Sequence, residues 1–273
     1  MSIIKSLSES LHERMNECVN ILQKKYIKAV RPVYGSDELG NLCHIGSCVL
    51  IKVKNTNYLI TAAHVLDENE ITTLYVGGGD GTDLVKIEGE GLETNAPMGN
   101  RKDDKFDFAI FPLTEEIVKK LGTVTFIDES SFLSEYLDNT RGLYLIIGYP
   151  NSKNKKNNIK DNKVLPKYFP YAANLNTSDE TFKIIGADKR YHYLLNYSKT
   201  SKDENNQEVN SIKPTGMSGG GLFFIEGMHK PENLRPNADC TGKLAGIPIE
   251  YKESQRVIMA TKLSLIISNI TKE

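Results

Sequence analysis

The sequence predicts an all-β protein, an antiparallel barrel or sandwich with a helix at each end of the chain. Short apolar, β-branched runs recur from Cys43 onward, turn-forming residues separate them, and few helical segments intervene. The expected strands are residues 47–53, 58–62, 71–76, 107–113, 124–127, 143–148, 183–185, 191–197, 221–225, 244–250 and 257–260. Two polar stretches, residues 151–163 and 199–211, are expected to form solvated loops.

The two terminal helices are predicted from apolar residues at helical spacing. The N-terminal stripe consists of Ile4, Leu7, Leu11, Met15, Cys18, Leu22 and Tyr26. The C-terminal stripe consists of Leu263, Ile266, Ile267 and Ile270, with Thr261 as the candidate N-cap. We expect the N-terminal helix to pack on its own fold; a docking site for a regulatory protein partner is the alternative.

Composition excludes several classes of protein. The chain has 273 residues, 34 Lys and Arg against 35 Asp and Glu, and a net charge of -1, which provides no basic footprint for nucleic acid. No apolar run reaches the roughly 18 residues of a membrane helix or forms the core of a secretory signal. Cys18, Cys43, Cys48 and Cys240 lack the close spacing of a zinc site, so we expect free thiols in a cytoplasmic protein without metal or cofactor.

Three segments place chemically useful side chains at the ends of predicted strands. The segment TAAHV brings His64 to the end of an apolar strand, and FDFAIF begins another strand with Asp107. A buried aspartate needs a partner, and an imidazole N–H would serve. The segment TGMSGGG surrounds Ser218 with glycines that leave room for substrate and for backbone N–H donors. A serine hydroxyl needs a base and such donors to act as a nucleophile.

Each segment alone has an ordinary structural interpretation. His64 is also typical of a hydrogen-bonded structural histidine, Asp107 of a turn cap, and the glycines of a flexible loop. The segment GMSGG fits the nucleophile elbow G-x-S-x-G of α/β-hydrolases, but a strand-like run follows it where that fold has a helix. The order His64, Asp107, Ser218 is that of the chymotrypsin triad.

Together, TAAHV, DFAIF and GMSGG in this order resemble a trypsin-like (chymotrypsin-fold) serine peptidase of the intracellular bacterial type, over residues 46–261. The resemblance implies two six-stranded antiparallel β-barrels with a catalytic cleft between them. It divides the chain into an N-terminal helix (1–30), a first barrel (31–135), a second barrel (136–261) and a C-terminal helix (262–273).

The resemblance also implies the roles of individual residues. Ser218 would be the nucleophile, His64 the general base and then acid, and Asp107 the carboxylate that orients the imidazole. The backbone N–H groups of Gly216 and Ser218 would form the oxyanion hole. The strand that pairs with substrate and walls the specificity pocket would contain Leu244, Ala245, Gly246 and Ile247.

Two departures from the family change what we expect of this chain. Met217 stands where secreted relatives carry an aspartate that captures a freed N-terminal amine, so activation by that route is not expected. The site is then either constitutively shaped or controlled by a partner. Ile212 and Thr215 offer no carboxylate to the specificity pocket, which favours small or apolar side chains at the cleaved position.

Three functions remain open from the sequence. The leading one is a serine endopeptidase that cleaves protein substrates through an acyl-enzyme. A binding scaffold that kept the fold and lost turnover is the alternative. A metal hydrolase using His44, His64 and Asp107 is less favoured, because the sequence has no H-x-x-x-H motif or Cys/His cluster.

Overall fold

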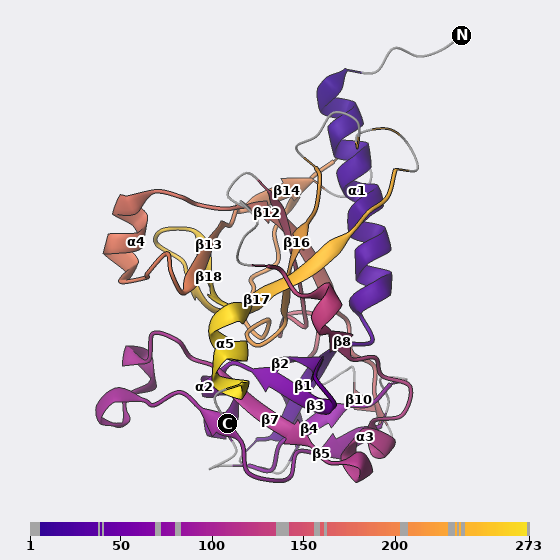
Figure 1. Cartoon of the computed structure of the whole chain (residues 1–273), viewed down its shortest axis with the longest axis vertical. Coiled ribbons are helices and arrows are strands. Elements are labelled where there is room, and N and C mark those ends of the chain that lie inside the picture. The colour runs from indigo at the N-terminus through magenta and orange to yellow at the C-terminus, as the bar shows by residue number, and fades with distance from the viewer. Residues whose placement is uncertain are drawn as a thin grey trace.

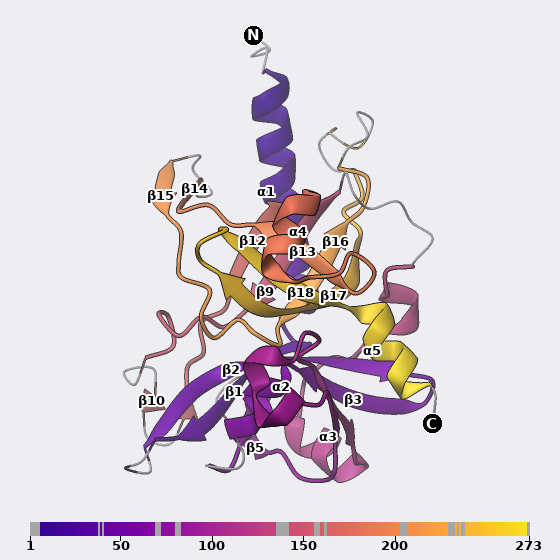
Figure 2. The same ribbon diagram turned by 90° about the vertical axis from the view of Figure 1, so that its left-hand side faces the viewer.

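Two antiparallel β-sheets lie one above the other in the computed structural model, with helices around them (Figures 1 and 2). The structure describes residues 6–37, 39, 41–68, 72–79, 83–134, 142–155, 159–160, 163–202, 207–228, 233, 235 and 238–271. The protein is therefore mostly β, with antiparallel sheets, as the sequence predicts.

The first sheet contains eight strands from the N-terminal half of the chain. They are β1 (Val30–Ser36), β2 (Leu42–Val53), β3 (Thr56–Thr61), β4 (Tyr75–Gly77), β5 (Leu84–Lys86), β6 (Leu92–Glu93), β7 (Ala109–Leu113) and β8 (Ile127–Asp128). Their order is β5-β4-β1-β2-β3-β7-β6, and β8 pairs in parallel with β2. The long strand β2 lies in the middle of the sheet and reaches the second sheet through Ser47.

The second sheet contains six strands from the C-terminal half. They are β9 (Leu143–Gly148), β12 (Phe169–Asn174), β13 (His192–Asn196), β16 (Gly221–Ile225), β17 (Gly242–Lys252) and β18 (Val257–Lys262), in the order β12-β9-β16-β17-β18-β13. A single bridge between Leu175 and Leu195 joins its two edges. Two short hairpins complete the strands, β10 (Ile159–Lys160) with β11 (Lys163–Val164) and β14 (Thr200–Lys202) with β15 (Glu208–Asn210).

The strands of the second sheet are apolar on both faces because they separate two clusters of buried side chains. In β9, Tyr144 and Ile146 belong to a cluster formed within the second sheet. Leu145 and Ile147 belong to a larger cluster that also takes in side chains of the first sheet and of the N-terminal helix. Neighbouring residues of a strand point to opposite faces, so the continuous apolar run is buried on both sides. The two sheets therefore share one core.

The N-terminal helix α1 (Leu7–Tyr26) begins with a capping box in which the side chains of Ser6 and Glu9 each accept from the other residue's backbone N–H. The residues of its apolar stripe that are buried are Cys18, Leu22 and Tyr26. Leu7 and Leu11 are exposed, and Ile4 lies outside the described residues. The helix thus packs on its own fold over its second half, and its first half extends beyond the sheets (Figure 1).

The remaining helices are short. They are α2 (Ala63–Asp67), α3 (Glu115–Leu121), α4 (Asp179–Ile185) and α5 (Leu263–Ile270), with 3-10 turns at Pro97–Gly99, Arg101–Asp103 and Glu129–Ser131. None of the described helices is long and apolar enough to cross a membrane.

Several local predictions need correction. The described part of residues 151–163 includes β10 and the first residue of β11, where a loop was expected. Residues 183–185 end α4 and are not a strand, because Ser178 caps this helix and Gly186, at a φ of 74°, ends it. The N-cap of α5 is Lys262, since Thr261 still pairs within β18. The described part of residues 199–211 is the β14–β15 hairpin, where a loop was expected.

A disulfide bond joins Cys18 of α1 to Cys240, which precedes β17. The expectation that all four cysteines are free thiols was therefore wrong; Cys43 and Cys48 remain thiols. The bonded pair is 222 residues apart in the sequence, so only the packing of α1 against the second sheet brings the two sulfur atoms together. The bond fastens the helix to that sheet.

We predict that the denatured protein shows two titratable thiols before reduction and four after it. Reduction should also lower the free energy of unfolding by about 2–5 kcal/mol, because a cross-link between distant residues restricts the unfolded chain. Thiol titration in guanidinium and urea unfolding with and without dithiothreitol measure both effects. The variant Cys240→Ser should lose no further stability on reduction. Four thiols before reduction would contradict the bond.

Candidate active site

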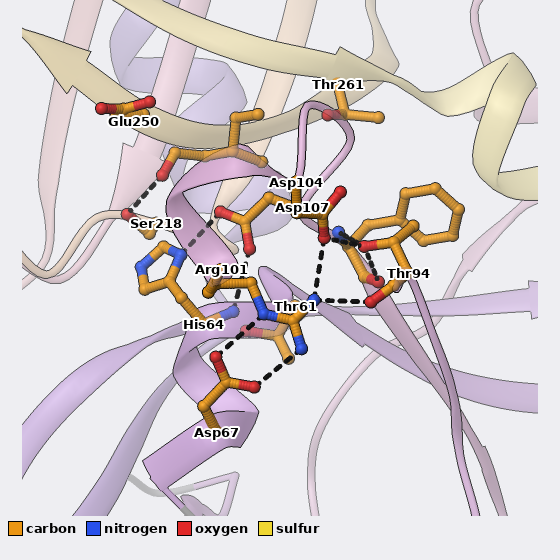
Figure 3. A network of polar contacts seen from close by, with 12 residues as sticks. Thr61, His64, Asp67, Thr94, Arg101, Asp104, Asp107, Ser218, Glu250 and Thr261 are labelled. Atoms are coloured by element: carbon orange, nitrogen blue, oxygen red, sulfur yellow. Dashed lines mark hydrogen bonds and ion pairs between the residues drawn. The ribbon is translucent and has the colours of Figure 1, made fainter. Parts of the chain in front are cut away.

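His64 lies where β3 ends and α2 begins. The fully buried Ala62 and Ala63 let the chain turn from the strand into the helix without a bulky side chain. The backbone N–H of His64 donates to Asp107 Oδ1 (2.9 Å), and its Nδ1–H donates to Asp107 Oδ2 (2.6 Å) (Figure 3). One carboxylate therefore fixes both the backbone and the ring of the histidine, and Nε2 is left for another partner.

Asp107 occupies a strained turn directly before β7. Its φ of 44° lies in the left-handed region, which a residue other than glycine adopts only when its surroundings impose it. His192 Nε2 of β13 donates to the carbonyl of Lys105 (2.8 Å). Thr261 Oγ1 of β18 donates to the carbonyl of Phe106 (2.6 Å). The second sheet therefore holds the turn that carries the acid of the first sheet.

Arg101 ties the helix of His64 to the turn of Asp107. Its guanidinium donates to Asp67, at the end of α2, through Nε (2.9 Å) and Nη2 (2.7 Å) (Figure 3). It also donates through Nη1 to Asp104 Oδ2 (2.8 Å). Asp104 Oδ1 accepts a hydrogen bond from the backbone N–H of Phe106, which directly precedes Asp107 (3.0 Å). Such a bidentate pair fixes geometry as well as contributing energy.

Ser218 lies in the turn before β16 and faces the same cleft as His64 and Asp107. The cleft has a volume of about 660 Å³. Ser218 Oγ donates to the carbonyl of Ile249 in β17 (3.1 Å), so in this state its hydroxyl is bonded to that carbonyl and not to the imidazole (Figure 3). A hollow of about 650 Å³ between α1 and β12 contains none of the three residues.

The turn before Ser218 presents two backbone N–H groups. Gly216 has a φ of 92°, and a Cβ there would lie 2.1 Å from Asn151 Oδ1, so only glycine fits. The carbonyl of Thr215 accepts the N–H of Asn151 (2.8 Å). A trans peptide directs its C=O and N–H to opposite sides, so the Gly216 N–H points away from Asn151. Within the described part of the chain, neither this N–H nor that of Ser218 has an acceptor.

Ser47 of β2 holds this turn from the first sheet. Its Oγ donates to the carbonyl of Gly216 (2.9 Å), and its N–H donates to the carbonyl of Ser218 (2.9 Å). Further along β2, His44 Nδ1 donates to Asn151 Oδ1 (2.7 Å), on the residue that fixes the Thr215 carbonyl. Ser47 is fully buried, where leaving hydrogen bonds unmade is costly. The first sheet therefore sets the conformation of the turn.

Burial and hydrogen bonding set the protonation of these groups. Burial opposes the charged form of His64, but the hydrogen bond and charge of Asp107 outweigh it and raise the pKa of His64 above its ordinary value. Burial raises the pKa of the Asp107 carboxyl above its ordinary value. The hydrogen bonds and charge of His64 act in the opposite direction but do not cancel this rise. Burial lowers the pKa of His44 to about 4 against its hydrogen bond to Asn151, so this histidine is neutral near pH 7.

The four residues predicted to contact substrate lie within the second sheet and do not line the cleft: Leu244, Ala245, Gly246 and Ile247. Three of them are buried side chains, and the glycine pairs with β16 on one side and β18 on the other. The cleft is lined by Ile249, Glu250 and Tyr251, further along the same strand. The register with β18 shifts between Pro248 and Glu250, where β17 turns its edge toward Ser218. Residues 249–251 of this strand, and not the predicted segment, therefore line the cleft.

Sequence reasoning missed the residues that support the site. One feature could have drawn attention to Ser47: it places a hydroxyl at the start of an otherwise apolar run of the sequence. Asn151 falls in a stretch predicted as a solvated loop, and Arg101 in an unremarkable polar segment. His44 forms a hydrogen bond with Asn151. The part of the chain that the structure describes contains no group of three or more His, Cys, Asp or Glu able to hold a metal ion.

Comparisons with known proteins add little to this picture. No family model matches the sequence, and no curated protein matches it. Among solved structures, the chain is similar to one described as "Aromatic interactions drive the coupled folding and binding of the intrinsically disordered Sesbania mosaic virus VPg protein". The identity is 14%, the TM-score is 0.47, and the match covers 87% of this chain and 93% of that chain. No conclusion about function follows from a similarity at this level.

We predict that Asp107→Asn lowers the pKa of His64. The carboxylate is what raises this pKa against the effect of burial, so an amide leaves the imidazole neutral down to a lower pH. NMR titration of the His64 ring measures the shift. Glu250→Gln, which removes a weaker charge effect on the same ring, is the matched control and should lower the pKa less. An unchanged pKa in Asp107→Asn would contradict the pairing.

Proposed function

We propose that this protein is a serine endopeptidase with Ser218 as nucleophile, His64 as general base and acid, and Asp107 as the orienting carboxylate. The observation that carries the proposal is the composition of one cleft. A serine hydroxyl, an imidazole paired with a carboxylate, and two backbone N–H groups without an acceptor in the described chain all belong to it. Acyl transfer through a serine uses groups of these kinds as nucleophile, base and oxyanion donors.

In the proposed reaction, the Ser218 hydroxyl leaves the carbonyl of Ile249 and passes its proton to His64 Nε2 while Oγ attacks the substrate carbonyl carbon. The carbonyl oxygen takes the negative charge, which the N–H groups of Gly216 and Ser218 stabilise. His64 then protonates the amine nitrogen, the C–N bond breaks, and an acyl-enzyme remains. Water gives a proton to His64, attacks the acyl carbon and releases the acid, and the proton returns to Ser218.

A peptide substrate would bind in extended form along the edge of β17. Pairing of β17 with β16 ends at Gly246, whereas pairing with β18 continues to Lys252. Beyond Gly246 the strand therefore has an edge without a β16 partner, and Ile249–Tyr251 present that edge to the cleft. Main-chain hydrogen bonds to such an edge do not depend on the side chains of the peptide. Peptides of many sequences can therefore form them, which suits a protein substrate.

We also propose that the two sheets correspond to the two six-stranded barrels of the chymotrypsin fold. The distribution of the triad supports this, because the first sheet and its loops supply His64 and Asp107, and the second supplies Ser218. The cleft runs between residues of both sheets. The helix, barrel, barrel and helix division predicted from the sequence follows from the same proposal.

The site needs no activating partner under this proposal. Met217 is buried in the aromatic cluster of the second sheet. Ser47 and Asn151 hold the carbonyls of the oxyanion turn by hydrogen bonds that are already made. The turn is therefore constitutively shaped, and control through α1 would have to act on access to the cleft.

A catalytically silent binding scaffold is the second candidate. One observation favours it: the Ser218 hydroxyl donates to Ile249 and not to the histidine. A serine held there permanently would not attack a carbonyl. Rotation about one side-chain bond separates the two states, so reactivity decides between the candidates.

We predict that a fluorophosphonate labels Ser218 in the purified protein without any added partner. Labelling should disappear in Ser218→Ala and slow by about 10²–10⁴-fold in His64→Ala, because the hydroxyl then lacks its base. Mass spectrometry of the labelled peptide and the rate of labelling measure this. Ser254→Ala removes an exposed hydroxyl outside the cleft and should label normally.

Folded wild-type protein that takes up no label would reject the peptidase and favour the scaffold. Labelling that a strong chelator abolishes would point to a metal-dependent reaction. Circular dichroism of each variant distinguishes loss of reactivity from loss of fold.

A further inference from the structure

A small cavity adjoins Ser218 at the edge of the open cleft, with which it shares Pro214, Ser218, Glu250 and Tyr251. Its volume is about 10 Å³. It is lined by the turn residues Pro214, Met217 and Ser218 and by residues of the neighbouring strands, which are Ile146, Pro248, Glu250, Tyr251 and Ile258. The cavity therefore lies between the turn that would hold the oxyanion and the strand edge that would hold the peptide.

The proposed function places one substrate side chain at this cavity. The scissile carbonyl carbon must reach Ser218 Oγ while its oxygen points to the N–H groups of Gly216 and Ser218. The backbone preceding that carbonyl would pair with residues 249–251. The residue that carries the scissile carbonyl has its side chain on the Cα next to the carbonyl carbon. This side chain therefore enters the space between the turn and the strand. The cavity described above is that space.

The size of the cavity limits what can enter. A volume of about 10 Å³ has room for roughly one water-sized group. A hydrogen atom or a methyl group fits this space. A branched or aromatic side chain does not fit unless the walls move.

The walls resist movement because they are part of a packed aromatic group. The ring of Tyr251 meets that of Tyr197 edge-on, with ring centres 5.1 Å apart. The ring centres of Tyr197 and Tyr171 are 4.6 Å apart. The hydroxyl of Tyr197 donates to the carbonyl of Ile212, which lies in the segment that leads into the turn. On the other side, Met217 is buried within the second sheet. Widening a close-packed wall costs free energy that a substrate side chain would have to supply.

We propose that Tyr251 and Met217 restrict the residue on the acyl side of the scissile bond to glycine or alanine. This inference rests on the proposed function and adds the substrate class to it. It narrows the preference for small or apolar side chains expected from Ile212 and Thr215. Tyr251 and Met217 are specificity-determining residues of the same site.

The test uses peptide diphenyl phosphonates that carry glycine, alanine, valine, leucine or phenylalanine at the position of the phosphonate. The second-order rate of Ser218 labelling should be about 10- to 200-fold higher for glycine and alanine than for leucine and phenylalanine. In Tyr251→Ala the leucine and phenylalanine probes should gain relative to alanine by a similar factor. Met217→Ala should shift the same ratio in the same direction, and it serves if the first variant does not fold.

The matched control is Tyr75→Ala, which truncates a tyrosine of β4 outside the cleft and the cavity and should leave the preference unchanged. Faster labelling of the wild type by leucine or phenylalanine probes would overturn this inference and leave the peptidase in place. An unchanged preference in both cavity variants would also overturn it. Failure of every phosphonate and of a simple fluorophosphonate to label Ser218 would reject the proposed function itself.

Discussion

The site depends on hydrogen bonds that cross from one sheet to the other, above all those of Ser47. This buried serine of β2 holds the carbonyls of Gly216 and Ser218, which belong to the second sheet. In the opposite direction, His192 and Thr261 hold the carbonyls of Lys105 and Phe106, the two residues directly before Asp107. Each sheet therefore fixes the loop that the other contributes. An unmade buried hydrogen bond costs about 1–3 kcal/mol, so a relative shift of the sheets would lose both stability and site geometry.

Apolar and polar contacts have different parts in this arrangement. The shared core holds the two sheets together over a wide area but specifies their relative position only loosely, since burial of apolar surface is not directional. The polar contacts are directional, and they concentrate around the cleft. Arg101 extends them within the first sheet by linking Asp67 and Asp104. The buried half of α1 belongs to the same shared core, and the disulfide at Cys18 fastens the helix to Cys240 before β17.

The sequence predicted the strands best where apolar runs were long, as at Leu143–Gly148 and Gly221–Ile225, because these strands are buried on both faces. It missed β1 and β12, whose prolines and polar residues weaken the pattern, and it mistook the end of α4 for a strand. His64, Asp107 and Ser218 could be named from their local segments. Ser47, Asn151 and the disulfide could not, because their roles depend on contacts with residues far away in the chain.

The proposed function requires that the two sheets present a hydroxyl, a paired imidazole and a preformed oxyanion turn in one place. A crystal structure of the protein after reaction with a fluorophosphonate would reveal whether they do. We expect a covalent bond from Ser218 Oγ to phosphorus, the phosphoryl oxygen within hydrogen-bond distance of the Gly216 and Ser218 N–H groups, and the Thr215 carbonyl still bonded to Asn151. An adduct with the phosphoryl oxygen in solvent, or a Thr215–Gly216 peptide turned so that its carbonyl faces the cleft, would contradict it.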